Sequence, residues 1–229
     1  MHQRIDKTKF IFYVLIFLFL SSINNISLIK VKENLSRVTS IEVNGLSNNL
    51  NFEVEKKLEF LLNRNIYKLD REIINKELNS YNYLDNYKVF KRYPSKIIIE
   101  LKQTKFLATT LKNNKKYIIG SNGKLINYKI FNYEKDIPKV FGKFSKEDFI
   151  SLNEILNKSN FKFQNIENIF FFPSGRMDIK TKNNLLVKLP KQNIDNAINK
   201  FNLIVQSNEL KEYNVIDLRI DSQVILSHE

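Results

Sequence analysis

The apolar positions of the chain form one uninterrupted run near the N-terminus and, after it, only short amphipathic patterns. Every residue from Phe10 to Leu20 is apolar, and the run continues to Ile29 with serine and asparagine interspersed. Twenty residues of α-helix are about 30 Å long, which matches the hydrocarbon core of a bilayer. The pattern therefore predicts a single transmembrane helix at residues 10–29.

Charges beside this run predict its orientation. Basic side chains outnumber acidic ones in residues 1–9, so this tail is expected to stay in the cytoplasm. Residues 30–37 then form a linker, and the chain from Val38 onward is expected to lie outside the cytoplasm. A cleaved signal peptide is the alternative, but no small-x-small cleavage site follows the run. We therefore expect an uncleaved anchor.

The next part of the chain alternates between strand and helix patterns. Asn44-Gly45 is a turn signal, and Asp70 is a suitable N-cap for a helix. The expected elements are a strand at 38–43, a helix at 52–63, a helix after Asp70 with Ile73, Ile74 and Leu78 on its apolar face, and strands at 87–91 and 96–101. Two helices on one face of a three-stranded sheet give an α+β fold. This order resembles a POTRA domain, which we place at residues 38–104.

Arg92-Tyr93-Pro94 stand immediately before the last of these strands. Proline cannot donate a ladder hydrogen bond, so it is tolerated at the start of a strand and not in its middle. We expect Pro94 to fix the backbone that enters the strand and Tyr93 to be half-buried beside the turn. The alternative is that Arg92, Tyr93 and Pro94 form a recruitment surface for another protein.

Residues 105–229 have a different pattern, in which strands predominate. Expected strands lie at 106–111, 116–119, 124–127, 166–172, 177–181, 185–189, 214–219 and 223–226, with a short extended piece at 137–142. Two helices interrupt them. One begins at the cap Ser145, with Asp148 three residues on, and the other runs from Pro190 to about Gln206. This order predicts a mostly antiparallel β domain with two helices on one face.

The residue types argue against an enzyme. The chain has no cysteine, and its two histidines, His2 and His228, lie in opposite terminal segments. A Cys–His pair or a histidine-rich metal site is therefore not expected. Asp217 and Asp221 could be imagined as a catalytic carboxylate pair, but an ion pair of Asp217 with Arg219 and a turn carboxylate at Asp221 is the expected arrangement. We predict no catalytic residues, no metal and no cofactor.

The net charge of +13 is spread along the chain and does not concentrate in one run. We interpret it mainly as solvated lysine-rich faces, with attraction to acidic partners or lipid headgroups as the alternative. Nucleic-acid binding is not expected, because the predicted topology places most of the chain outside the cytoplasm.

In order and spacing, the motifs of the chain resemble the FtsQ/DivIB family of bacterial cell-division proteins. The residues that carry the resemblance are Ile41-Glu42-Val43-Asn44-Gly45, Leu69-Asp70, Arg92-Tyr93-Pro94 followed by Ile97-Ile98-Ile99, Asn122-Gly123, Pro138-Lys139-Val140-Phe141-Gly142, Leu189-Pro190 and Val215-Ile216-Asp217-Leu218-Arg219. The resemblance implies a non-enzymatic, single-pass scaffold of the divisome in the cytoplasmic (inner) membrane at the division septum. It implies FtsB-like and FtsL-like partners, which link the scaffold to septal peptidoglycan synthesis. The alternative is a POTRA-bearing protein-translocation or envelope-assembly factor.

The last predicted strand, Gln223 to Ser227, has no charge or proline to protect its outer edge. An open edge of this kind accepts an added strand, so a partner segment is expected to cover it. The family resemblance implies that an FtsB-like protein is that partner. Carried over by position, the contact residues are Ile220, Ser222, Gln223, Val224, Ile225, Leu226 and Ser227.

Overall fold

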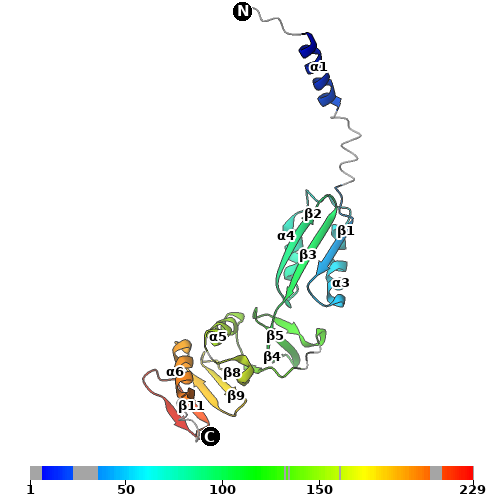
Figure 1. The fold of residues 1–229 in the computed structure, drawn as a ribbon. Helices are drawn as coiled ribbons and strands as arrows, with labels where there is room; N and C mark the ends of the chain where they lie inside the picture. The colour runs from blue at the N-terminus through cyan, green and yellow to red at the C-terminus, as the bar shows by residue number, and fades with distance from the viewer. Residues whose placement is uncertain are drawn as a thin grey trace, which may run out of the picture. The chain divides into compact units, whose positions relative to one another are not determined.

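The computed structural model describes residues 7–22, 36–131, 133, 135–159, 161–206 and 213–228. The chain divides into two compact units (Figure 1). The first comprises Met1–Ser80 and Tyr87–Lys102, and the second comprises Tyr81–Asn86 and Gln103–Glu229.

Helix α1 (Lys7–Ser22) occupies the first part of the apolar run. The remainder of the predicted transmembrane helix, residues 23–29, lies outside the described residues, as do residues 1–6 of the tail and 30–35 of the linker. Within the part of the chain that the structure describes, no helix combines the length and apolarity needed to cross a membrane.

The first unit has the β-α-α-β-β order that the sequence predicts. Its elements are β1 (Ser40–Asn44), α3 (Asn48–Lys57), the short 3-10 helix η1 (Glu59–Leu61), α4 (Arg71–Asn79), β2 (Leu84–Arg92) and β3 (Lys96–Gln103). The sheet order is β1-β3-β2, and β1 runs parallel to β3. Parallel neighbours need a crossover connection, which here contains both helices.

Alternation along the strands explains why the helices cover one face only. Ile97, Ile99 and Leu101 of β3 are buried, whereas Ile98 between them is only partly buried. The buried side chains pack with Val54, Leu58, Leu61, Ile74 and Leu78 of the helical segment to form the core. The predicted α+β arrangement of the first unit is therefore confirmed.

Several predicted details of the first unit are wrong. The helix predicted at residues 52–63 begins earlier, at Asn48, and ends at Lys57, after which η1 completes the segment. Asp70 caps α4 as predicted, because its Oδ1 accepts the N–H of Glu72 at 2.9 Å. Ile73, however, is exposed, so the apolar face of α4 consists of Ile74 and Leu78.

The second unit is built on one nine-stranded sheet. Its strands are β4 (Phe106–Lys112), β5 (Lys115–Gly120), β6 (Leu125–Asn127), β7 (Lys139–Gly142), β8 (Ile166–Phe171), β9 (Met177–Thr181), β10 (Leu186–Leu189), β11 (Val215–Asp217) and β12 (Ile225–Ser227). Their order in the sheet is β12-β11-β10-β9-β8-β7-β4-β5-β6. The pairs β10/β11, β4/β7 and β7/β8 are parallel and the other neighbouring pairs are antiparallel, so the sheet is mostly antiparallel, as predicted.

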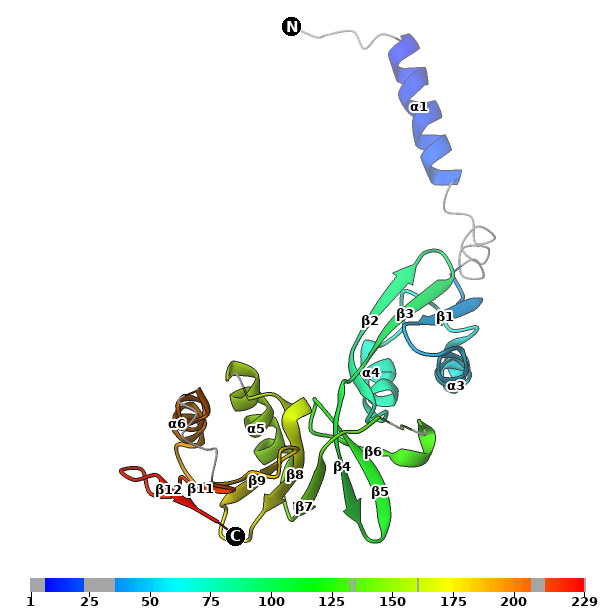
Figure 2. The same ribbon diagram turned by 60° about the horizontal axis from the view of Figure 1, so that its bottom comes forward.

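Helices α5 (Lys146–Lys158) and α6 (Ile194–Gln206) lie side by side on one face of this sheet (Figure 2). The capping box predicted for α5 is present, with reciprocal hydrogen bonds between Ser145 and Asp148. The helices bury Phe149, Leu152, Leu156, Ala197, Ile198 and Phe201 against the sheet. This core fixes the inner face of β10 and β11 through Val187 and Ile216, both fully buried, and thereby positions the last strand.

Candidate partner-binding edge

Strand β12 is the outermost strand at one end of the nine-stranded sheet. It pairs antiparallel with β11, with Ile225 opposite Asp217, Leu226 opposite Ile216 and Ser227 opposite Val215. No other described strand lies beside it. Because an outermost strand leaves alternate backbone N–H and C=O groups without a ladder partner, β12 can accept one further strand.

The side chains around this edge are apolar and exposed. Ile220 is 51% exposed, Val224 41% and Ile225 46%. Leu226 points the other way, because it is partly buried and packs against the core under α6. The predicted residues thus form an exposed apolar edge that is continuous with the core of the domain.

The connection from β11 to β12 is a turn held by α6. The backbone N–H of Gln223 donates to the carbonyl of Ile220 at 3.2 Å. The ammonium group of Lys200 in α6 donates to Oδ1 of Asp221 at 2.8 Å. Ser222 and Gln223 are exposed in this turn. The structure therefore gathers all seven predicted contact residues in one strand and the turn that leads into it.

Asp217 and Arg219 form the expected ion pair beside this edge. The guanidinium Nε lies 2.8 Å from Oδ1 of Asp217, and a second nitrogen contacts Oδ2. This hydrogen bonding lowers the pKa of Asp217, and the carboxylate in turn raises the pKa of Arg219. Asp217 is thus paired with Arg219 and the turn carboxylate Asp221 with Lys200.

A row of charged residues crosses the helix-free face of the sheet toward β12. Strand pairing places Asp178 beside Lys188, Lys188 beside Asp217, and Asp217 beside Ile225. Asp178 is only 5% exposed, and burial raises its pKa despite the nearby positive charges of Arg176, Lys188 and Arg219. Within the described residues, its Oδ1 has no hydrogen-bond partner. The row therefore combines an ion pair near the edge with a buried carboxyl further inside the sheet.

Sequence analysis did not identify an aromatic contact that frames β12. The rings of Tyr213, just before β11, and His228, just after β12, are stacked with centroids 5.2 Å apart. The antiparallel pairing of β11 with β12 brings these two positions together. Knowledge of that register would therefore have predicted the contact. Lys200 had no comparable signal, because its partner Asp221 is distant in sequence.

Arg92, Tyr93 and Pro94 are all exposed at the turn between β2 and β3 in the first unit. Tyr93 is 57% exposed, so the prediction that it is half-buried is wrong. Its ring stacks on the ring of Tyr67 at 4.8 Å and not on the core.

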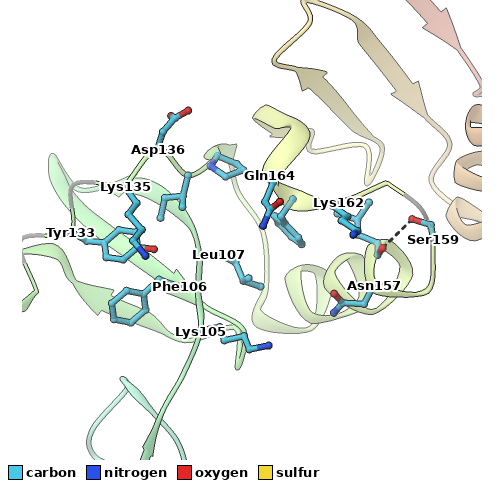
Figure 3. A pocket seen from close by; sticks show the side chains of 14 residues that line it. Lys105, Phe106, Leu107, Tyr133, Lys135, Asp136, Asn157, Ser159, Lys162 and Gln164 are labelled. Carbon is cyan, nitrogen blue, oxygen red and sulfur yellow. Dashed lines mark hydrogen bonds between the residues drawn. The ribbon is translucent and has the colours of Figure 1, made fainter. Parts of the chain in front are cut away.

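A cavity of about 510 Å³ in the second unit is an alternative candidate site (Figure 3). Its walls include Lys105, Lys135 and Lys162, together with Asp136. Asp136 is paired with Lys182 at 2.6 Å, and this contact lowers its pKa.

The hydroxyl of Ser159 at this cavity donates to the carbonyl of Leu156 at 3.0 Å and accepts the N–H of Phe161. These hydrogen bonds tie the hydroxyl to the C-terminal end of α5. Among the described residues, no group of three or more histidine, aspartate or glutamate side chains could hold a metal ion.

Comparison with known proteins identifies both units. The family model "Cell division protein FtsQ/DivIB, C-terminal" matches residues 108–219, and the model "POTRA domain, FtsQ-type" matches residues 36–103. The cell division protein FtsQ of Bradyrhizobium diazoefficiens is 20% identical over 199 residues, which are 83% of this chain and 56% of that protein. The chain thus spans little more than half the length of this relative.

A solved structure, the major extracytoplasmic domain of the trans isomer of the cell division protein DivIB from Geobacillus stearothermophilus, matches 48% of this chain and 98% of its own. The identity is 12% and the TM-score 0.36, too low for this likeness to bear on the fold. The two family models together account for both folded units, in the expected order. The chain belongs to the FtsQ/DivIB family of cell division proteins.

Proposed function

We propose that this protein is a non-enzymatic, membrane-anchored scaffold of the divisome that binds an FtsB-like partner by strand addition at β12. The observation that carries the proposal is the exposed, uncharged edge formed by Val224, Ile225 and the backbone of β12. Family membership supports the role in cell division.

Strand addition explains how such an edge achieves affinity and specificity. The partner backbone forms ladder hydrogen bonds with the free groups of β12, independent of side-chain identity. Its side chains then alternate between the two faces of the sheet. On one face they contact Ile225 and the Asp217–Arg219 pair, and on the other they contact Val224 and the partly buried Leu226. Ile220, Ser222 and Gln223 in the turn recognise the end of the added strand.

The proposed topology gives this edge access to its partner. Residues 10–29 anchor the chain in the cytoplasmic membrane with residues 1–9 inside, and both folded units lie outside the cytoplasm at the septum. The apolar run and its basic flank support this arrangement. An FtsL-like protein is the second partner that we expect the scaffold to bind outside the cytoplasm. The match of FtsQ-type models to both units favours this role over protein translocation or envelope assembly.

A proline at position 225 tests the mechanism. Ile225→Pro removes the backbone N–H that pairs with Asp217 of β11, so it displaces the strand to which a partner would add. Because the side chain is exposed, both units should remain folded. Pull-down of the FtsB-like partner by the full-length variant should be lost. In cells, the FtsB-like partner should not be found bound to the tagged variant at mid-cell.

Ile225→Thr is the matched control. It retains the β-branched shape and the backbone N–H, so binding should weaken only slightly if the backbone ladder provides most of the affinity. Unchanged binding by Ile225→Pro, with thermal unfolding equal to that of the control, would refute strand addition at β12.

A further inference from the structure

Three separate segments of the POTRA domain meet at the end of the domain where the chain enters it. We call residues 36–39, 62–68 and 92–96 the tyrosine end. The backbone N–H of Val38 donates to the carbonyl of Arg64 at 2.9 Å, and that of Thr39 donates to the carbonyl of Ser95 at 2.8 Å. The N–H of Ile66 donates to the carbonyl of Ser36 at 2.8 Å. The three segments therefore form one well-defined surface.

Two stacked tyrosine rings lie on this surface. Tyr67 is 63% exposed and Tyr93 57% exposed, with ring centroids 4.8 Å apart and nearly parallel. Stacking holds both rings outside the core, where they form a broad aromatic face with phenolic hydroxyl groups. Phe60 is exposed nearby, beneath the guanidinium group of Arg64. Tyrosine of this kind is enriched where a membrane meets water, because the ring prefers the headgroup level.

The charges of the tyrosine end have one sign. Its three segments contain no aspartate or glutamate, and their basic residues are Arg37, Arg64, Lys68, Arg92 and Lys96. Lys96 is paired with Glu42 of β1, whereas the side chains of the other basic residues are exposed. Basic residues of this kind around aromatic rings are attracted to the anionic headgroups of a lipid surface.

The tether makes a membrane the natural neighbour of this surface. Only the residues between Ser22 and Ser36 separate helix α1 from the tyrosine end. Even when fully extended, they reach about 50 Å. Lys30 and Lys32 add basic residues along this tether. A chain anchored through α1 therefore keeps the tyrosine end within reach of the bilayer.

We propose that the tyrosine end of the POTRA domain binds the anionic lipid surface beside the anchor, with Tyr67 and Tyr93 at headgroup level and Arg37, Arg64, Lys68 and Arg92 around them. The proposal rests on the proposed membrane anchoring. It assigns the turn at residues 92–94 to lipid contact, and recruitment of a protein through that turn becomes the competing outcome.

Fluorescence quenching can test this directly, because the chain contains no tryptophan. Tyr93→Trp places a single fluorophore in the tyrosine end and retains an aromatic ring to stack on Tyr67. Phe52→Trp is the control, since Phe52 is equally exposed in α3, a helix that begins beyond the opposite end of β1. The full chain of each variant is reconstituted in vesicles that contain anionic lipid and a lipid with a nitroxide at the headgroup.

We expect the tryptophan at position 93 to be quenched at least twofold more than the tryptophan at position 52. This excess should fall in vesicles of neutral lipid and at high salt, where charges are screened within a few ångströms. Adding Arg64→Gln and Arg92→Gln to the Phe52→Trp and Tyr93→Trp variants should also reduce the excess quenching at position 93. Adding Lys112→Gln and Lys115→Gln, which remove the same charge from the exposed turn between β4 and β5, should not.

The outcomes separate this inference from the proposed anchor. If the chain is released from the vesicles by a high-salt wash, the anchor fails and the inference falls with it. If the chain stays bound but both tryptophans are quenched equally, the anchor stands and the lipid-binding surface is overturned. Equal quenching in vesicles, combined with shielding of position 93 only after a divisome protein is added, would assign the turn to recruitment instead.

Discussion

The two outer strands of the nine-stranded sheet have the same length but different surroundings. At one end, the edge of β6 is covered, because the side-chain amide of Asn82 donates to the carbonyl of Leu125 at 2.9 Å, and Ile126 is fully buried. At the other end, Val224 and Ile225 of the β12 edge are exposed. Both strands lie at the sheet boundary, yet among the described residues only the edge of β6 receives a side-chain hydrogen bond from its own chain. This difference is the reason why we propose β12 as the partner-binding edge.

The largest contrast is expected in stability. Ile126→Ala in β6 removes a fully buried side chain and should lower the free energy of unfolding by about 2–5 kcal/mol. Ile225→Ala in β12 truncates an exposed side chain and should cost less than about 1 kcal/mol. Denaturant unfolding of both variants measures the contrast. Equal losses would show that β12 is part of the core and not a free edge.

The buried carboxyl behind β12 should be a source of instability. Asp178→Asn removes a carboxylate whose pKa is raised by burial and whose Oδ1 has no hydrogen-bond partner among the described residues. At neutral pH it should stabilise the protein by on the order of 1 kcal/mol. The wild-type penalty is present above the raised pKa and disappears as pH falls below the ordinary aspartate value. The two proteins should therefore converge in acid, as measured by thermal unfolding at several pH values.

Uncovering β6 should have a smaller effect on stability and none on binding. Asn82→Ala deletes the amide that donates to Leu125 and should cost about 0.5–1.5 kcal/mol in unfolding free energy. Affinity for the FtsB-like partner should remain that of wild type, because the side chains of β6 do not match the partner strand that adds to β12. A loss of partner binding in this variant would break the distinction between the two edges.

The smallest expected effect concerns the ion pair next to β12. Arg219 lowers the pKa of Asp217, so the pair contributes stability above the ordinary aspartate pKa and loses it as pH falls through the lowered value. Arg219→Ala should therefore be less stable than wild type at neutral pH and should lose less stability on acidification. The unfolding temperature of both proteins is measured as the pH is lowered. Equal changes in the two proteins would contradict this contribution of the ion pair.

Sequence patterns predicted the order of elements better than their ends. The capping residues Asp70 and Ser145 mark their helices correctly because an N-cap is a local hydrogen bond. The helix predicted at residues 52–63 lies earlier in the chain than expected. Leu58 and Leu61 are buried in the core through a 3-10 turn, which breaks the α-helical period. The exposed position of Tyr93 depends on Tyr67, a partner that is distant in sequence.

The candidate edge was predictable for a related reason. An uncharged strand at residues 223–227 is visible in the sequence, and sheet order then places it at the boundary. The contacts that fix it are different. Lys200 with Asp221, and Tyr213 with His228, depend on tertiary positions that no local pattern encodes.

Backbone amide hydrogen exchange of β12 tests the central claim most directly. If the extracytoplasmic segment of an FtsB-like partner adds as a strand, its addition to the full chain should slow exchange of the amides at Val224–Ser227 and leave Leu125–Asn127 of β6 unchanged. Slowed exchange elsewhere, with β12 unchanged at saturating partner, would contradict partner binding at this edge.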